Sequence, residues 1–384
     1  MDVRSAMKIP RYRWFLWAAT LVAAVFFVLQ MGFLPRGHAT TAARGFELLD
    51  TLINHIRNDY LDERDPVQTA EGTFRGLVNS LDPLSAYLSK DLAADYNSQT
   101  GQETEPGMVV LKRYASFPQV VAVIEKSPAE TVGVKMGDLV SAIGGRNTLS
   151  MSLTEVKLLL RGTDERPVDI RVLRGNDTHN LSVPRALLFP APFTFTRTAG
   201  QPARLSIHRF DTDIVSAIKR DVVPTLKDGK SPLVLDLRDC QDGTIDEARQ
   251  LVNLFVKTAD CGRFEGRGGA KETVACPADA DLGAVPLVVW TDAGTAGPAE
   301  FAAGVLQEVR KAKVVGFETP GLVGRTTLFP LRDDSAVLLT SGIFVLPSGR
   351  KLWDDGLVPD AVITVDKLNE KTYLEKTLPL LPKL

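Results

Sequence analysis

The stretch from Pro286 to Lys311, PLVVWTDAGTAGPAEFAAGVLQEVRK, decides how the fold of this chain is understood. It opens with an apolar run, Leu287–Trp290, that is typical of a buried strand, and it continues through a short turn. A helix is predicted to begin at Pro298, because proline is favoured at the first helical position and apolar residues follow at helical spacing. A helix N-terminus favours developing negative charge, so this arrangement can present a nucleophile. The residue at that position is Gly297, which has no side chain.

The residues around this turn resemble those of the C-terminal processing (tail-specific) serine peptidases, which use a Ser–Lys dyad. The family run G-[ST]-A-S-A-[AS]-E corresponds to Gly294–Glu300, and its helix motif A-G-x-L-Q corresponds to Ala303–Gln307. The family motif V-G-E-x-T-x-G-K-G, which carries the lysine, corresponds to Val315–Val323. The resemblance places three residues of this chain at the family's nucleophile, base and orienting glutamine, in that order: Gly297, Leu322 and Thr326.

The resemblance also identifies the positions of the oxyanion hole. The family uses the N–H of the residue after the serine, and here that residue is Pro298, which has no N–H. A second donor comes from the glycines of D-L-R-x-N-x-G-G, which in this chain reads DLRDCQDG at residues 236–243. The first of these glycines is replaced by Asp242, whose charge would repel an oxyanion, and the second is Gly243. We therefore expect no intact catalytic group at this site.

Other candidate nucleophiles and ligands have simpler interpretations. Thr295 lies two positions before Gly297, and we expect its hydroxyl to bond to the backbone of its own turn. Ser348 and Lys351 lie close in sequence, in a segment that is typical of a turn between strands. The histidines fall in no ligand spacing, so we predict neither a metal nor a cofactor; they are His38, His55, His179 and His208.

Residues 101–186 resemble a PDZ domain of the bacterial protease type. The resemblance rests on Ser127–Val140 with the following Ile143-Gly144-Gly145, a capping box at Ser152–Glu155 that opens a helix, and a strand at Val168–Arg174. Such domains take a peptide as an added strand and hold its C-terminal carboxylate in backbone N–H groups. The candidate peptide-binding residues are Gly107, Met108 and Val109 in the carboxylate loop, and Val156 and Leu160 on the helix beside the groove. Core packing is the alternative role for Val156 and Leu160.

The chain as a whole is predicted to be an α/β protein with five parts. A small helical N-terminal region at 44–100 includes SLDPLSAYL at 80–88, which resembles a family signature, with Leu84 in place of a histidine; we expect a structural role for it. A peptidase-like core with a largely parallel sheet is expected at 187–384, because strand and helix patterns alternate there, including a helix predicted at 212–226. The predicted parts are a basic tail at 1–13, a transmembrane helix at 14–34, the helical region, the PDZ domain at 101–186 and the core.

An uncharged apolar run, Trp14–Leu34, follows four basic residues near the N-terminus. As a helix it would be roughly 31 Å long at about 1.5 Å per residue, which is enough to span a bilayer. The excess of basic residues before it places the N-terminus in the cytoplasm and the bulk of the chain on the periplasmic side. The alternative is a signal peptide cleaved among the small residues at 39–43.

Three cysteines lie in the predicted core, and an exported chain meets oxidising conditions. Cys261 and Cys276 flank a predicted hairpin with Gly268-Gly269 at its tip. Counting outward from that tip sets the two cysteines directly opposite each other, so we hypothesise a disulfide in a register inferred from the turn alone. Cys240 is left as a small, half-buried residue.

The composition is that of a globular protein of two or three domains, with 44% hydrophobic residues and a formal net charge of −2, which argues against a nucleic-acid partner. The hypothesis is a membrane-anchored, catalytically degenerate relative of tail-specific peptidases that binds or scaffolds protein segments. Expected partners are protein or peptide segments such as C-terminal tails, the membrane, and either a second copy or an active paralogue. The alternative is an active serine-type endopeptidase with a displaced nucleophile.

Overall fold

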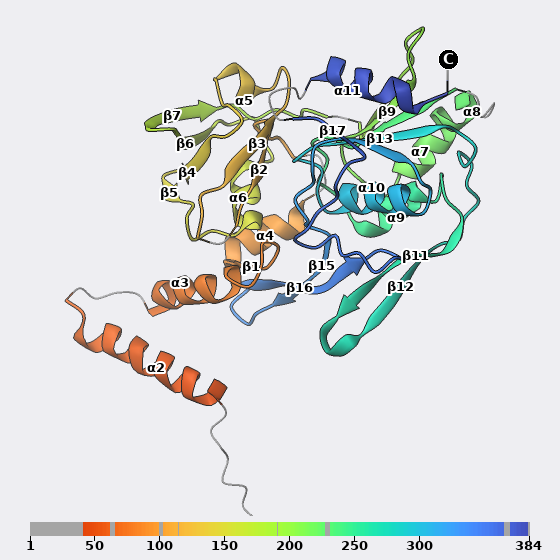
Figure 1. Ribbon diagram of the computed structural model, residues 1–384. Coiled ribbons are helices and arrows are strands. Elements are labelled where there is room, and N and C mark those ends of the chain that lie inside the picture. The colour runs from red at the N-terminus through yellow and green to blue at the C-terminus, as the bar shows by residue number, and fades with distance from the viewer. Residues whose placement is uncertain are drawn as a thin grey trace, which may run out of the picture. The chain divides into compact units, whose positions relative to one another are not determined.

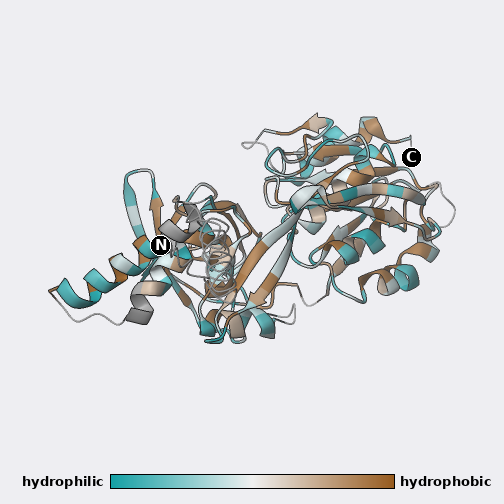
Figure 2. Cartoon of the chain, turned by 90° about the horizontal axis from the view of Figure 1, so that it is seen from below, coloured by the Kyte–Doolittle hydropathy of each residue, from teal (hydrophilic) through white to brown (hydrophobic). Residues whose placement is uncertain are grey.

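The computed structural model describes residues 41–61, 66–99, 103–113, 115–189, 191–226, 231–364 and 369–382. The predicted anchor at 14–34 lies outside these ranges. Within them, no helix combines the length and the apolar character needed to cross a bilayer. The chain divides into two compact units, Met1–Ala70 and Glu71–Leu384. The first contains helix α2 (Thr41–Asp59), whose turns alternate between hydrophilic and hydrophobic residues (Figure 2), and the start of α3 (Pro66–Asn79).

The second unit contains a PDZ-like sheet, a mostly parallel sheet and a second antiparallel sheet (Figure 1). Its elements run in the order β1 (Ala86–Leu88), α4 (Lys90–Ser98), β2 (Met108–Leu111), β3 (Gln119–Val123), α5 (Pro128–Thr131), β4 (Leu139–Ile143), β5 (Arg146–Asn147), α6 (Leu153–Leu160), β6 (Val168–Arg174), β7 (Asp177–Val183), β8 (Phe193–Thr196), β9 (Ala203–Ile207), α7 (Ile214–Asp221), α8 (Val223–Leu226), β10 (Leu233–Asp236), α9 (Ile245–Val252), β11 (Thr258–Gly266), η1 (Arg267–Gly269), β12 (Lys271–Cys276), β13 (Leu287–Thr291), α10 (Pro298–Glu308), β14 (Lys313–Gly316), β15 (Gly324–Pro330), β16 (Ala336–Val345), β17 (Ala361–Val362), α11 (Glu370–Thr377) and η3 (Leu378–Leu380).

The central sheet has the strand order β17-β14-β13-β10-β9-β8. All neighbouring pairs are parallel except β8 with β9 at the edge. Every residue of β10 and β13 is buried, as expected for parallel strands covered on both faces. The largely parallel sheet predicted from the alternation of strand and helix patterns is confirmed.

The two faces of this sheet pack against different helices, because side chains alternate along a strand. Leu235 and Val289 belong to the main core cluster, which also contains buried residues of α7, α9 and α10. Val234 and Val288 point to the other face, where they pack with Tyr373 of α11. The sheet is therefore the middle layer of three. The loops after β10 and β13 emerge at the same edge, where ligands bind in open α/β sheets.

The N-terminal part of this unit differs from the predicted helical region at one place. Residues 86–88 form strand β1, which pairs antiparallel with β16, so the segment is not helical throughout. Asp82 holds the turn that leads into β1, because its Oδ1 accepts hydrogen bonds from the backbone N–H groups of Leu84 and Ser85, both at 2.8 Å. The same oxygen accepts from the Thr340 hydroxyl of β16 at 2.8 Å, and Oδ2 accepts from the Ser85 hydroxyl at 2.7 Å. The structural role expected for this motif is therefore found.

The PDZ-like sheet has the order β2-β3-β4-β6-β7, with β5 paired to β4. Helix α6 begins as predicted, because both hydrogen bonds of the capping box between Ser152 and Glu155 are formed. Strand β2 lies at the edge of the sheet, so one side of it has no strand neighbour among the described residues. An edge strand of this kind can accept an added peptide strand.

Two other predictions from the sequence need correction. The helix predicted at 212–226 breaks into α7 and α8, and Pro224 at this break lacks the N–H that a continuous helix requires. Cys261 and Cys276 are joined by a disulfide with their Cα atoms 6.2 Å apart, but they are not directly opposite. The three-residue turn η1 and a bulge between Thr258 and Gly262 shift the register, so Cys276 faces Thr258.

We expect Asp82→Asn to lower the free energy of unfolding of the full-length protein by about 1–3 kcal/mol. The amide keeps the shape of the carboxylate but replaces one acceptor oxygen with a donor, which leaves buried donors unpaired. Urea denaturation followed by tryptophan fluorescence measures the change. Asp177→Asn, at an exposed hairpin position, is the matched control and should change stability by less than about 0.5 kcal/mol. Equal effects of the two variants would contradict the role of Asp82.

Candidate functional site

The turn that carries the degenerate nucleophile position connects β13 to α10. Gly297 caps α10 with φ +55° and ψ −113°, a conformation that side-chain-bearing residues rarely adopt. Its carbonyl accepts a hydrogen bond from the Phe301 N–H at 2.9 Å. Hydrolases place a nucleophile on this kind of sharp strand-to-helix turn. A Cβ atom built on Gly297 would meet only the Leu322 carbonyl oxygen, at 3.9 Å, so there is room for a side chain that the sequence does not supply.

Hydrogen bonds hold this turn in place against the loop after β10. The fully buried Thr295 hydroxyl accepts from the Asp292 N–H at 2.9 Å and lies 2.9 Å from the Leu237 carbonyl, to which it donates. The N–H of Asp239 donates to Asp292 Oδ1 at 3.1 Å. The Ala296 N–H bonds to the Cys240 carbonyl at 3.1 Å. Thr295 therefore has the structural role that its position predicted.

Leu322 stands beside Gly297 and is held there by a buried carboxyl. Glu300, in the first turn of α10, accepts hydrogen bonds from the N–H groups of Gly321 at 2.8 Å and Leu322 at 2.9 Å, and from the Thr319 hydroxyl. Burial raises the pKa of Glu300 to about 7, against the opposing effect of these donors. The Leu322 side chain packs in the same buried cluster as Leu153 and Val156 of the PDZ-like part.

Asp242 also contacts the PDZ-like part. Its carboxylate forms an ion pair with the guanidinium of Arg161, the residue that ends helix α6. Burial opposes its ionisation, but the Arg161 and Lys157 cations outweigh burial and hold the pKa of Asp242 below its ordinary value. Gly243 follows with φ +113°, and a Cβ atom there would lie 2.2 Å from the Phe210 carbonyl oxygen, so only glycine fits.

One cavity of about 260 Å³ brings together all six positions that the resemblance assigned to catalysis. Its wall includes helix α6 as well as the two loops of the parallel sheet. The six positions are Asp242, Gly243, Gly297, Pro298, Leu322 and Thr326. The cavity thus contains every position that the resemblance assigned to the nucleophile, the base and the oxyanion hole, and neither Gly297 nor Leu322 carries a hydroxyl or an amine.

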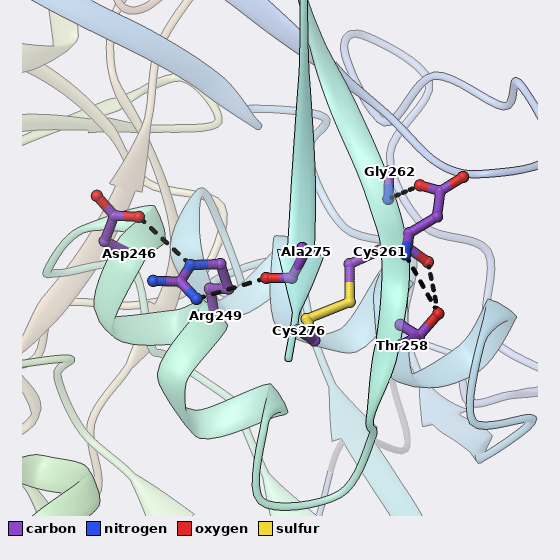
Figure 3. Close-up of a disulfide and its surroundings, with 8 residues drawn as sticks. Asp246, Arg249, Thr258, Cys261, Gly262, Ala275 and Cys276 are labelled. Atoms are coloured by element: carbon purple, nitrogen blue, oxygen red, sulfur yellow. Dashed lines mark hydrogen bonds and ion pairs between the residues drawn. A yellow bond between two sulfur atoms is a disulfide. The ribbon is translucent and has the colours of Figure 1, made fainter. Parts of the chain in front are cut away.

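A second cavity, of about 720 Å³, adjoins Gly297 and Pro298 on the side of the β11–β12 hairpin. Figure 3 shows the disulfide that joins the two strands, with Arg249 of α9 lying between Asp246 and the strand. The Arg249 guanidinium is 3.4 Å from the Ala275 carbonyl oxygen and 3.5 Å from Asp246 Oδ1. The disulfide and this contact fix the hairpin wall of the cavity.

The remaining candidates are placed elsewhere. The Ser348 N–H and hydroxyl both donate to the Glu308 carboxylate, in a turn after β16 that Lys351 closes by a bridge to Val345. His208 stacks on Phe189 at 4.0 Å, and burial lowers its pKa to about 4. Within the described ranges no group of three or more ligand residues is arranged to hold a metal ion.

The predicted peptide-binding residues of the PDZ-like part lie together. Gly107 has φ +86°, and a Cβ atom there would lie 2.2 Å from Ser127 Cβ, so the loop requires glycine. Met108 and Val109 are buried in edge strand β2. Val156 and Leu160 are 0% and 4% exposed in the cluster that contains Met108, which corresponds to the core-packing alternative.

Four residues of the site were not predicted from the sequence. Lys157 of α6 and Arg161 at its C-terminal end are one turn apart and both line the smaller cavity, and their i, i+4 spacing was a signal that the sequence offered. Gln241 also lines this cavity. Glu300 lay inside a quoted motif, but no sequence pattern indicated that its carboxyl would be buried beneath residues 319–322.

Comparisons with known proteins agree with this geometry. Residues 203–363 match peptidase family S41, and residues 119–174 match the PDZ domain. The chain is 24% identical over 387 residues to a "Probable CtpA-like serine protease" of Staphylococcus aureus, a match that covers 98% of this chain and 78% of that protein. It is 28% identical over 324 residues to a "Carboxy-terminal-processing protease" of Bartonella bacilliformis, a match that covers 81% of this chain and 73% of that protein.

A solved structure shows the same fold. The photosystem II D1 C-terminal processing protease matches with a TM-score of 0.69 and 22% identity, over 87% of this chain and 90% of that one. The matched regions therefore define a PDZ domain followed by an S41 peptidase domain. Residues 203–363 thus belong to a domain of peptidase family S41, and over most of its length the chain is similar to C-terminal processing proteases.

We expect the stability difference between the wild type and Glu300→Gln to fall by about 3 kcal/mol as pH rises from about 4.5 to about 7. The buried carboxyl of the folded protein keeps a proton that the unfolded chain, with an ordinary pKa near 4.5, has already released. The raised pKa of Glu300 therefore stabilises the folded protein below about pH 4.5, and this stabilisation is lost as pH rises to about 7.

Urea unfolding at half-unit pH steps measures this prediction, and the glutamine variant removes the titration while keeping the size of the side chain. Exposed Glu318→Gln is the control and should keep the wild-type slope. Parallel stability curves for the wild type and Glu300→Gln would show that Glu300 has an ordinary pKa.

Proposed function

We propose that this protein is a membrane-anchored pseudopeptidase that binds or scaffolds protein segments outside the cytoplasm. The observation that carries the proposal is the single cavity in which Gly297, Leu322 and Pro298 stand at the positions of nucleophile, base and oxyanion donor. A Ser–Lys mechanism needs a hydroxyl and an amine within hydrogen-bond reach. Neither glycine nor leucine supplies such a group, and proline has no N–H to donate.

The alternative, an active endopeptidase with a displaced nucleophile, has little support from the neighbouring hydroxyl groups. Thr295 is fully buried, and its hydroxyl is occupied by the Asp292 N–H and the Leu237 carbonyl. The Ser348 hydroxyl lies 2.9 Å from the Glu308 carboxylate, in a turn away from the cavity. Activating either residue would require breaking hydrogen bonds that hold the turns themselves.

Features that could bind protein segments are present. Edge strand β2 can accept a peptide as an added strand, and two cavities adjoin Gly297. A relative is named for processing at carboxyl termini, which favours C-terminal tails as the ligands here. Bound segments would be sequestered, or presented to an active paralogue or a second copy.

Placement at the membrane rests on the sequence and on the cysteine pair. The apolar run at 14–34, preceded by basic residues, predicts a single span with the N-terminus in the cytoplasm. The disulfide between Cys261 and Cys276 suits an oxidising compartment such as the periplasm.

We expect the full-length protein in detergent to hydrolyse neither unfolded proteins nor peptides with apolar C-termini above the buffer rate. A fluorophosphonate probe should leave it unlabelled, because none of the described residues that line the cavity is a serine or threonine hydrogen-bonded to a base. Mass spectrometry of intact protein and peptide products measures both. Thr295→Ala and Ser348→Ala serve as controls. Turnover or labelling that either variant abolishes would establish the displaced-nucleophile enzyme instead.

The combination of Gly297→Ser with Pro298→Ala and Leu322→Lys should be labelled by the fluorophosphonate at least about tenfold faster than Gly297→Ser alone. The space beside Gly297 admits a side chain, Pro298→Ala restores an N–H, and the lysine supplies the base. Labelling rates measured by mass spectrometry test this expectation. The combination Pro298→Ala with Leu322→Lys, without the serine, is the matched control. Equal labelling of the single and triple variants would show that the missing base does not limit the site.

A further inference from the structure

The smaller cavity contains two polar atoms whose hydrogen-bonding capacity is unused. Lys157 extends from α6, and its amine makes no hydrogen bond or ion pair with another described residue. The Oε1 atom of Gln241 is buried and likewise has no hydrogen-bond partner in the described structure. Leaving such groups unpaired costs stability, so their presence together in a cavity indicates a ligand that would pair with them.

The charges around Lys157 leave its ammonium group available. Asp242 on the facing loop exerts the largest charge effect on Lys157, but its carboxylate is already paired with Arg161. Glu105 lies 3.9 Å from the same arginine and is the other acid that acts on Lys157. Burial lowers the pKa of Lys157 to about 8, so at neutral pH the group is mainly a desolvated cation. A bound carboxylate would compensate that cost.

The rest of the cavity wall sets the size and character of the ligand. Its volume of about 260 Å³ lies below the roughly 300–1,000 Å³ of sites for drug-sized molecules, which suits the end of a chain more than a long segment. Several of its wall residues are aliphatic: Leu84, Leu153, Leu158, Leu322 and Leu338. A ligand with an anionic group, an N–H donor and an aliphatic side chain matches all three features.

We propose that this cavity binds the C-terminal residue of a peptide, with its carboxylate on Lys157, its amide N–H on Gln241 Oε1 and its aliphatic side chain among the leucines. This inference rests on the proposed function and specifies its ligand. The site differs from the carboxylate loop of the PDZ domain at Gly107. Pro298 supports it by adding apolar surface, and the ion pair between Asp242 and Arg161 leaves Lys157 as the cation of the cavity that has no partner among the described residues.

The experiment compares a fluorescent peptide ending in a free leucine carboxylate with the same peptide ending in a leucine amide. Fluorescence anisotropy with the full-length protein in detergent gives the two dissociation constants. The wild type should bind the free acid about tenfold more tightly, which corresponds to about 1.4 kcal/mol. Lys157→Met should abolish that preference, and Lys157→Arg should retain part of it.

Lys135→Met, at an exposed position of the same domain, is the matched control and should keep the wild-type preference. Near-ultraviolet circular dichroism checks that each variant is folded. A preference that persists in Lys157→Met would assign carboxylate capture to another place, such as the Gly107 loop, and would overturn the inference while leaving the proposed function intact. Equal dissociation constants of the acid and the amide for the wild type would likewise overturn the inference while leaving the proposed function intact. If neither peptide binds, both the inference and the proposed ligand class fail.

Discussion

The buried carboxyl of Asp292 is the constraint on which the site geometry depends. Its Oδ1 accepts hydrogen bonds from the N–H groups of Asp239 and Gly294, which belong to the loops after β10 and β13. Burial raises the pKa of both Asp292 and Asp239, and repulsion between them raises that of Asp239 further, so the pair favours a shared proton. A Cβ atom at Gly294 would lie 3.1 Å from Asp239, which leaves little space for any other residue. These contacts set where Gly297 and Asp242 lie, and none of them needs a catalytic side chain.

The substituted residues also have contacts of their own. Leu322, at the position of the base, packs with Leu153 of α6, and Asp242, at a glycine position of the oxyanion loop, pairs with Arg161 at the end of the same helix. A lysine at 322 would place a charge in that apolar cluster, which is costly without a partner. Leu322 and Asp242 therefore both contribute to the contact between the PDZ domain and the peptidase domain.

Much of the fold could be predicted from the sequence, because its signals are local. The apolar run at Leu287–Trp290, the capping box at Ser152 and the proline at the start of α10 each fix an element without tertiary information. The register of the β11–β12 hairpin could not be predicted, because the turn η1 and the bulge after Thr258 depend on how the backbone closes. Strand β1 was missed for a related reason, since three residues become a strand only by pairing with β16, far away in sequence. The motif resemblance located the six degenerate positions, but the roles of Lys157 and Gln241 arise from packing between domains, which spacing does not reveal.

A site without a reacting atom follows different energetics from an enzyme. Catalysis requires tighter binding of the transition state than of the substrate, so an active peptidase gains nothing from holding its ground state more tightly. A degenerate relative has no such restriction, and its affinity can increase through groups that pair only with the bound ligand, as Lys157 and Gln241 are placed to do. In a pseudopeptidase no cleavage step competes with dissociation, so the off-rate alone sets the lifetime of the complex. Under the proposed function, a glycine at position 297 would therefore suit this site to retention of a bound segment rather than to turnover.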